Sequence, residues 1–429
     1  MSDALPHAMR ELVGPVDGAW LRMDQPTNQM IITSMLVFDG PVDHDALRRL
    51  LQTKLLRNPR FTQRVDQPRL PFLPSHWEPD PRFALDAHLS RVELPEGAGE
   101  LELQRLVSER MSAPLPRDRP LWEIVHVERG GAGSALVARV HHAVGDGVAL
   151  VKLLLSLTDE GAELEPEVVG IAHAPMPRGF ALVKKLAEQA RTLARLLLLP
   201  ADPPSGLRGA LGTQKRCAWS SSLPLEPLKQ LAKRHGAKLN DLLMAHLAGA
   251  LREHLGEHGR VPRELRALVP VYLRGRAGDP ELGNHFGLVF VPLPLGEAAP
   301  EARVSKLKAT MDALKSAEDA LVALGVLGAM GLASEGIERL GIDIFTRKAS
   351  LLVTNVPGPP TALHLAGRTL DSVMVWAPMS GSIGTGVSLL SYDGKLRVGV
   401  TCDARLAARP EAVVASFERQ VHAMLSAPG

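Results

Sequence analysis

Residues 134–157 read SALVARV-HHAVGDG-VALVKLLLSL, and this stretch decides how the first half of the chain folds. The apolar run Ser134–Val140 predicts a buried strand, and the leucine-rich run Val148–Leu157 predicts a helix. Between them, HHAVGDG is expected to form a tight loop in which Gly145 and Gly147 relieve backbone crowding. The order of strand, loop and helix therefore places two histidines and an aspartate at the mouth of a buried strand.

This loop has a structural and a catalytic interpretation. A histidine at a strand end is usually a structural hydrogen-bonding group, and Asp146-Gly147 alone is an ordinary turn signal. The spacing HHxxxDG also suits a general base held on a tight loop, because imidazole accepts protons near pH 7. The flanking strand and helix favour the second interpretation, so we predict a catalytic site centred on this loop.

Composition limits the class of protein. A chain of 429 residues is long for one core, so two domains are expected. Its 45% hydrophobic and 22% charged residues are typical of a globular enzyme. The net charge of +2 argues against a dedicated nucleic-acid binder. Cys217 and Cys402 are too few for a disulfide framework or a zinc cluster, so we expect no metal and a reduced, cytoplasmic setting.

No targeting or membrane-spanning segment is expected. The segment Met1–Glu11 lacks the basic and apolar regions of a signal peptide. The longest apolar stretch, Ala320–Ala333, is shorter than the ~20 residues that a membrane-spanning helix needs.

Apolar periodicity predicts mixed α/β domains. A hairpin at Gly130–Gly133 argues against a doubly wound parallel sheet. We predict an N-terminal domain over 1–172 that carries HHxxxDG, a linker over 173–214, and a C-terminal domain over 215–429, with the site in the cleft between the domains. Strands are expected at 30–38, 121–127, 134–140, 216–221, 267–273, 286–292, 350–355, 372–378, 386–392 and 395–403, and helices at 44–56, 101–111, 148–157, 180–199, 227–235, 241–254 and 410–425.

The linker contains a basic amphipathic helix, Phe180–Leu199. Two placements are open: its leucines pack on the protein core, which is favoured, or the helix lies on a lipid surface. The leucines on its apolar side are Leu182, Leu186, Leu193 and Leu197.

Further motifs follow in a fixed order along the chain. They are PVDGAW at 15–20, Pro120-Leu121-Trp122, Leu239-Asn240-Asp241, VPVYLR at 269–274, Gly283-Asn284, NVPGP at 355–359 and SYDG at 391–394. With HHxxxDG they make the chain resemble the bacterial wax ester synthase/diacylglycerol acyltransferase family, within the chloramphenicol-acetyltransferase-like, coenzyme A-dependent acyltransferases. One departure is Tyr272, where the family usually has a small hydroxyl residue. The resemblance implies two such domains, each a mixed sheet with flanking helices, and an active-site tunnel at their interface.

The resemblance also implies the reaction. A fatty acyl group would move directly from acyl-coenzyme A to a long-chain alcohol or diacylglycerol, in wax ester or triacylglycerol synthesis, without a covalent intermediate or a cofactor. By the family pattern, His142 is the general base and His141 shapes the loop. Asp146 is expected to hold the loop by pairing with an arginine, for which Arg274 is a candidate, and Gly147 to permit the exit into the helix.

The donor to the oxyanion stays open among Asn240, Thr354 and Asn355. Each has a structural alternative, and for Asn240 we favour the N-cap of the helix that begins at Asp241. Pro120-Leu121-Trp122 is expected to buttress a strand, and the turn through Pro357 to be a rigid strand exit.

Two other functions remain open. One is a condensation-type enzyme whose acyl donor is bound to a carrier protein, and the other is a non-catalytic lipid-binding protein of the same fold. The expected partners are acyl-coenzyme A and an apolar alcohol or diacylglycerol, with no nucleic acid. The protein is expected either free in the cytoplasm or at the surface of the inner membrane or of lipid inclusions.

Overall fold

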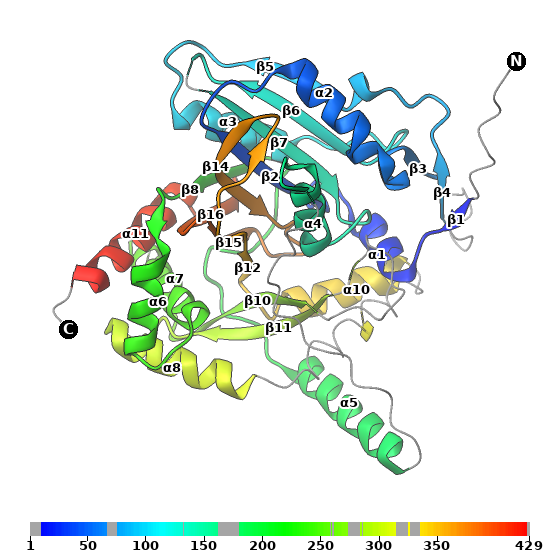
Figure 1. The fold of residues 1–429 in the computed structure, drawn as a ribbon. Helices are drawn as coiled ribbons and strands as arrows, with labels where there is room; N and C mark the ends of the chain where they lie inside the picture. Colours follow the sequence, from blue (N-terminus) through cyan, green and yellow to red (C-terminus); the bar gives the residue numbers. More distant parts are fainter. Residues whose placement is uncertain are drawn as a thin grey trace, which may run out of the picture.

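A computed structural model of the protein describes residues 10–66, 75–131, 133–161, 180–257, 259, 261–272, 284, 286–314, 325–326 and 335–426. Two large mixed sheets, each with helices packed on it, dominate these residues (Figure 1). The predicted mixed α/β architecture is confirmed.

The first sheet is built around the strand that leads to HHAVGDG. Its strand order is β13-β14-β2-β7-β6-β5, and β7 pairs antiparallel with β2 and β6. The predicted hairpin between β6 and β7 is present. At its turn Gly133 has φ +96°, and a Cβ there would lie 2.8 Å from the Phe38 carbonyl oxygen, so glycine is required. The strands are β2 (Ile31–Phe38), β5 (Leu89–Glu93), β6 (Trp122–Glu128), β7 (Ser134–His141), β13 (His364–Leu365) and β14 (Arg368–Trp376).

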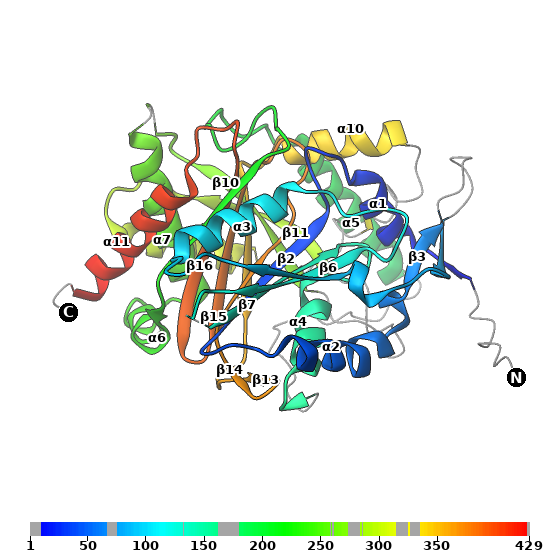
Figure 2. The ribbon, with the colours of Figure 1, turned by 90° about the horizontal axis from the view of Figure 1, so that it is seen from above.

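Helices cover both faces of this sheet because β7 is apolar on both sides. Leu136 and Ala138 belong to the core under α2 (His44–Thr53) and α4 (Gly147–Leu157). Ala135 and Val137, which point the other way, pack with α3 (Glu100–Ser112). Figure 2 shows the sheet between these helices.

The second sheet has the strand order β11-β10-β12-β15-β16-β8, with the short β9 also paired to β16. Its β10–β12 and β12–β15 pairs are parallel and the others are antiparallel. Its helices gather around α7, which is mostly buried. The elements are β8 (Lys215–Trp219), β9 (Leu223–Pro224), α6 (Leu225–Arg234), α7 (Leu239–Gly256), β10 (Leu265–Tyr272), β11 (Phe286–Leu293), α8 (Pro300–Ala313), β12 (Leu351–Pro357), β15 (Thr385–Tyr392), β16 (Lys395–Asp403) and α11 (Pro410–Ser426).

One strand of the second half completes the first sheet. β14 pairs antiparallel with β2 along most of its length, from Leu370 opposite Phe38 to Trp376 opposite Thr33. The range 1–172 therefore does not contain the whole of the first sheet. The two halves are joined by backbone hydrogen bonds as well as by side-chain contacts.

Smaller elements surround these sheets. They are α1 (Pro15–Met23), α10 (Glu335–Thr346), three 3-10 turns (Leu55–Arg57, Pro59–Phe61 and Leu85–Ala87) and a small sheet of β1 (Glu11–Leu12), β3 (Gln63–Asp66) and β4 (His76–Pro79). None of the helices in the described part of the chain is both long and apolar enough to cross a membrane.

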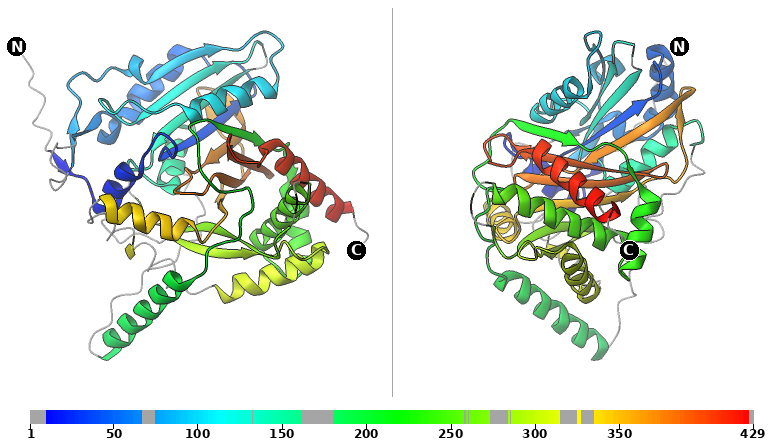
Figure 3. Two further views of the ribbon diagram at one scale, coloured as in Figure 1. Left: turned by 180° about the vertical axis from the view of Figure 1, so that it is seen from behind. Right: turned by 90° about the vertical axis from the view of Figure 1, so that its left-hand side faces the viewer.

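The linker helix α5 (Phe180–Leu198) extends away from the rest of the molecule (Figure 3). Its C-terminal end packs on the second half through Leu193 and Leu196. Leu197, predicted on the packing side, is instead 48% exposed, because the helix turns Leu196 inward. The side chains of Leu182 and Leu186 lie outside the described residues.

Candidate active site

His142 lies one residue past the end of β7, and its backbone is held on both sides. Its N–H donates to the Met30 carbonyl oxygen at 2.7 Å. Its own carbonyl oxygen accepts a hydrogen bond from the Asn284 Nδ2 at 2.8 Å. The strand end and a residue of the second half together fix the position of this histidine.

Aromatic rings enclose the imidazole of His142. Trp20 stacks on it with ring centroids 4.1 Å apart and an interplanar angle of 15°. The ring centroid of Phe286, at the start of β11, lies 5.4 Å from that of His142. The side chain is buried, and its Nδ1 has no hydrogen-bond partner among the described residues. The ring is therefore shielded from solvent, and no described residue pairs with its Nδ1.

Burial lowers the pKa of His142 below its ordinary value of 6.5. The charge of Asp146 and the side chain of Asn284 oppose this effect and raise the pKa, but burial prevails. The imidazole is therefore neutral at pH 7, which is the form that accepts a proton.

His141 makes the contacts of a residue that shapes the loop. Its Nδ1 accepts the Ala143 N–H at 3.0 Å, and its Nε2 lies 3.9 Å from Asp24 Oδ1. Burial keeps its pKa well below 6.5. These contacts turn His141 toward the protein interior.

Asp146 caps the helix that follows the loop. Its Oδ1 accepts the Ala149 N–H at 2.9 Å, in the first turn of α4. Arg274, the predicted partner, lies outside the described residues.

Gly147 does not have the predicted backbone role, which was to permit the exit of the loop into the helix. Its φ is not in the left-handed region, and a Cβ there would meet no atom within 4 Å. The chain turns into α4 without needing a glycine at this point. The space beside Gly147 belongs to a cavity that this residue lines.

The structure separates the three oxyanion candidates. Asn355 Nδ2 donates to Asn240 Oδ1 at 2.9 Å, and Asn355 is exposed. Asn355 lies on the same face of β12 as Leu351 and Val353, which pack with α7, so the Asn355–Asn240 pair lies on the helix side of the sheet. Thr354 points to the opposite face, where its Oγ1 lies 3.0 Å from Ser388 Oγ. Of the three, only Thr354 faces the side on which Val356 packs against the N-terminal core.

The predicted N-cap role of Asn240 is wrong. The helix begins at Leu239, so Lys238 is its N-cap and Asn240 lies inside the first turn. Asp241 performs the capping, because its carboxylate accepts the Lys238 N–H at 3.0 Å. An acidic side chain at the third helical position reaches back to the cap N–H, which shifts the start of the helix toward the N-terminus.

Pro120-Leu121-Trp122 supports the end of β7. The Leu121 carbonyl oxygen accepts the His141 N–H at 2.9 Å. Trp122 Nε1 donates to the Phe61 carbonyl oxygen at 3.0 Å, and its ring stacks on His88. The predicted role as a strand buttress agrees with these contacts.

Pro357 ends β12, as expected of a strand exit. Gly358 follows so close to β15 that a Cβ would lie 2.4 Å from the Ser391 carbonyl oxygen. The tight turn therefore depends on the glycine of this motif as well as on its prolines.

Three residues at the site were not among the predicted site residues. Asn284 Nδ2 donates to Asp17 Oδ1 at 2.7 Å as well as to His142, so Asp17 and Asn284 link the two halves at the histidine. Asp17 and Trp20 are three residues apart on α1, and this spacing puts both side chains on one helix face. The DxxW pattern at 17–20 was the signal that could have identified them.

The described residues of the site do not form a metal centre. In the described ranges, no group of three or more His, Cys, Asp or Glu side chains is placed to hold a metal ion.

Known proteins match the chain along most of its length. The wax ester synthase/diacylglycerol acyltransferase catalytic domain matches residues 13–178, and the C-terminal domain of that family matches residues 282–425. A candidate diacylglycerol O-acyltransferase of Mycobacterium tuberculosis strain CDC 1551 is 29% identical over 92% of this chain and 86% of its own length. A probable diacylglycerol O-acyltransferase of strain H37Rv is 26% identical over 87% of this chain and 86% of its own length.

Solved structures share the fold. The wax ester synthase/diacylglycerol acyltransferase from Marinobacter aquaeolei VT8 has a TM-score of 0.72 at 20% identity, covering 97% of this chain and 98% of its own. The first condensation domain of the calcium-dependent antibiotic synthetase has a TM-score of 0.62 at 18% identity, covering 98% and 96%. These similarities agree with the predicted pair of chloramphenicol-acetyltransferase-like domains. The chain therefore belongs to the wax ester synthase/diacylglycerol acyltransferase family.

Proposed function

We propose that this protein transfers a fatty acyl group from acyl-coenzyme A to the hydroxyl of a long-chain alcohol or of diacylglycerol. The observation that carries the proposal is His142, which is buried where the two halves meet, is kept neutral and has a ring nitrogen with no hydrogen-bond partner in the described part of the chain. A neutral imidazole shielded from solvent is a competent general base.

The proposed reaction is direct. The ring of His142 takes the proton of the alcohol as the alcohol oxygen attacks the thioester carbon. The tetrahedral intermediate collapses by expelling the coenzyme A thiolate, which takes the proton back from the imidazolium. The products are an ester and free coenzyme A, so acyl-coenzyme A is a substrate and no cofactor is needed. The Thr354 hydroxyl, which faces the N-terminal core, is our candidate donor to the oxyanion.

The acceptors are apolar, so we propose that the protein works at the surface of a membrane or a lipid inclusion. Several large apolar side chains on α5 and α10 support this proposal because they are exposed. They are Leu197, Leu198, Ile337, Leu340 and Ile344.

Release of free thiol from palmitoyl-coenzyme A tests the function. We expect release that depends on hexadecanol or dioleoylglycerol and falls to background without an acceptor. Folded protein that releases no thiol with either acceptor would contradict the proposal. A carrier-protein thioester would then be the donor to try.

The pH dependence of kcat/KM tests the role of His142. Because burial lowers the pKa of this group, the basic form persists below pH 6.5, and protonation removes activity only at lower pH. We therefore expect kcat/KM to fall on acidification with a midpoint below pH 6.5. A midpoint above pH 6.5 would contradict a buried neutral base.

Replacing Asp146 with asparagine separates the effect of its charge on His142 from its role as the cap of α4. Asparagine caps a helix about as well as aspartate, so we expect α4 and the thermal unfolding temperature to be retained. Loss of the carboxylate removes a charge that raises the pKa of His142, so the acidic limb of the pH profile should move to lower pH. If the acidic limb stays at the same pH, the charge of Asp146 does not act on the pKa of His142.

A further inference from the structure

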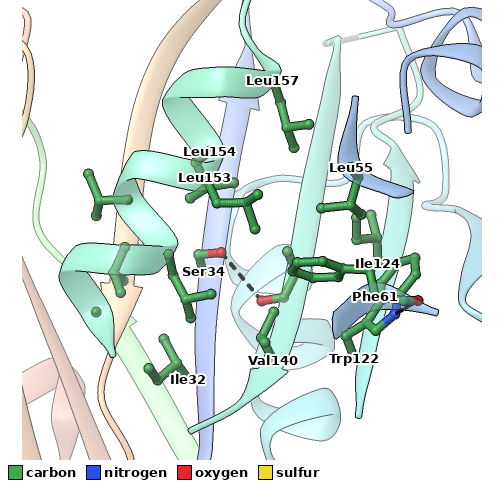
Figure 4. Close-up of a pocket in the computed structure, with 15 residues that line it drawn as sticks. Ile32, Ser34, Leu55, Phe61, Trp122, Ile124, Val140, Leu153, Leu154 and Leu157 are labelled. Carbon is green, nitrogen blue, oxygen red and sulfur yellow. Dashed lines mark hydrogen bonds between the residues drawn. The ribbon is translucent and has the colours of Figure 1, made fainter. Parts of the chain in front are cut away.

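An apolar cavity lies between α4 and the first sheet (Figure 4). Gly147, five residues after His142, lines it, and a Cβ at Gly147 would meet only open space. At this position the cavity borders the end of the catalytic loop.

The cavity follows α4 away from His142. On the sheet side, Val140 and Ile32 are paired across β7 and β2, and Ala138 and Ser34 are paired one step deeper. Leu157, at the end of α4, lines the far part. From His142 to Ala138 the strand advances about 13 Å, and α4 is about 15 Å long between Gly147 and Leu157. The cavity is thus oriented as a channel that starts beside the catalytic loop.

The chemistry of the lining suits a hydrocarbon. None of the described residues that line the cavity carries a charged side chain. The Ser34 hydroxyl donates to the Ala138 carbonyl oxygen at 3.4 Å, and the Trp122 indole N–H donates to Phe61. The polar groups on the wall are therefore already paired and offer nothing to a polar ligand.

Resting on the proposed function, we propose that this cavity receives the unbranched hydrocarbon tail of a substrate and that Ala138, opposite Ser34, sets the length of tail that is accepted. The tail belongs either to the acyl thioester or to the alcohol. Ala138 and Ser34 are small and face each other in the middle of the channel, so the passage to its deeper half runs over them.

The dimensions give an expected length. An extended chain advances about 1.2 Å per bond, so 13–15 Å corresponds to about eleven to twelve bonds, or about twelve to thirteen carbons. The cavity volume of about 40 Å³ has room for only a few water molecules, so a tail has to displace the leucines of α4 outward.

Chain-length profiles of matched variants test this proposal. One series varies the acyl-coenzyme A from four to eighteen carbons with a fixed alcohol, and the other varies the alcohol with a fixed thioester. Ala138→Leu should lower kcat/KM at least tenfold for chains of twelve carbons or more in one series, and much less for four to six carbons. The series that changes identifies which substrate supplies the tail.

Ala135→Leu is the matched control. It makes the same substitution on the same strand, but the side chain points to the α3 face and does not reach the cavity. Its length profile should keep the shape of the unmodified protein. Leu157→Ala enlarges the far end and should move the preferred length upward by two to four carbons, so it tests the proposal even if Ala138→Leu fails to fold.

The outcomes are distinguishable. Equal losses at all lengths in both series with Ala138→Leu, or an unchanged preference with folded Leu157→Ala, would overturn the assignment of the cavity while leaving acyl transfer intact. Absence of thiol release from the unmodified protein with every pair of substrates would overturn the proposed function, and the assignment of the cavity with it.

Discussion

His142→Ala is expected to lower acyl transfer by about two to four orders of magnitude, which is the usual contribution of a general base. Alanine cannot accept the proton of the alcohol, and the backbone contacts of residue 142 to Met30 and Asn284 do not involve the ring. The loss should therefore appear mainly in kcat. The measurement is thiol release under saturating acyl-coenzyme A and acceptor.

Folding is the control for this variant. Because the ring stacks on Trp20, its removal leaves a gap, so His142→Gln should be tested beside alanine and both checked by thermal unfolding. His142→Gln retains a polar side chain but no basic nitrogen and should be as inactive. Near-full activity of either folded variant would rule out the proposed mechanism.

Asn284→Ala is expected to lower kcat/KM by about tenfold to a hundredfold, in line with about 1.5–3 kcal/mol for a hydrogen bond to a charged group. Asn284 donates to the carboxylate of Asp17 and to the carbonyl oxygen of His142. Without it, the histidine loses its hydrogen bond to the second half, and Asp17 loses a partner inside the protein.

The pH profile distinguishes positioning of the base from general destabilisation. The Asn284 side chain raises the pKa of His142, so Asn284→Ala should also shift the acidic limb to lower pH. Asn355→Ala is the matched control, because Asn355 is also a hydrogen-bonded asparagine but lies on the helix side of β12. It should change kcat/KM less than twofold. An Asn284→Ala variant that behaves like this control would show that the link to the second half has no role at the base.

The local elements could be predicted because their signals are local. The run 134–157 folds as β7, a tight loop and α4, and the hairpin before it lies at the predicted glycines. The loop histidines could be identified because strand, loop and helix occur in one continuous segment. The cap of α7 was misplaced since Asn240 and Asp241 are both good capping residues, and only the backbone decides which position each takes.

The sequence by itself determined the mixed α/β class, most of the strands and helices, and the loop that carries His142, because apolar periodicity and turn residues act over short distances. Tertiary structure alone decided that β14 completes the first sheet and that Asp17 and Asn284, 267 positions apart, meet at His142. It also decided that Asn355 faces away from the side occupied by Thr354 and that Gly147 borders a cavity. Such contacts join surfaces from distant segments, and their partners are chosen by how whole sheets and helices pack, which no local pattern of residues contains.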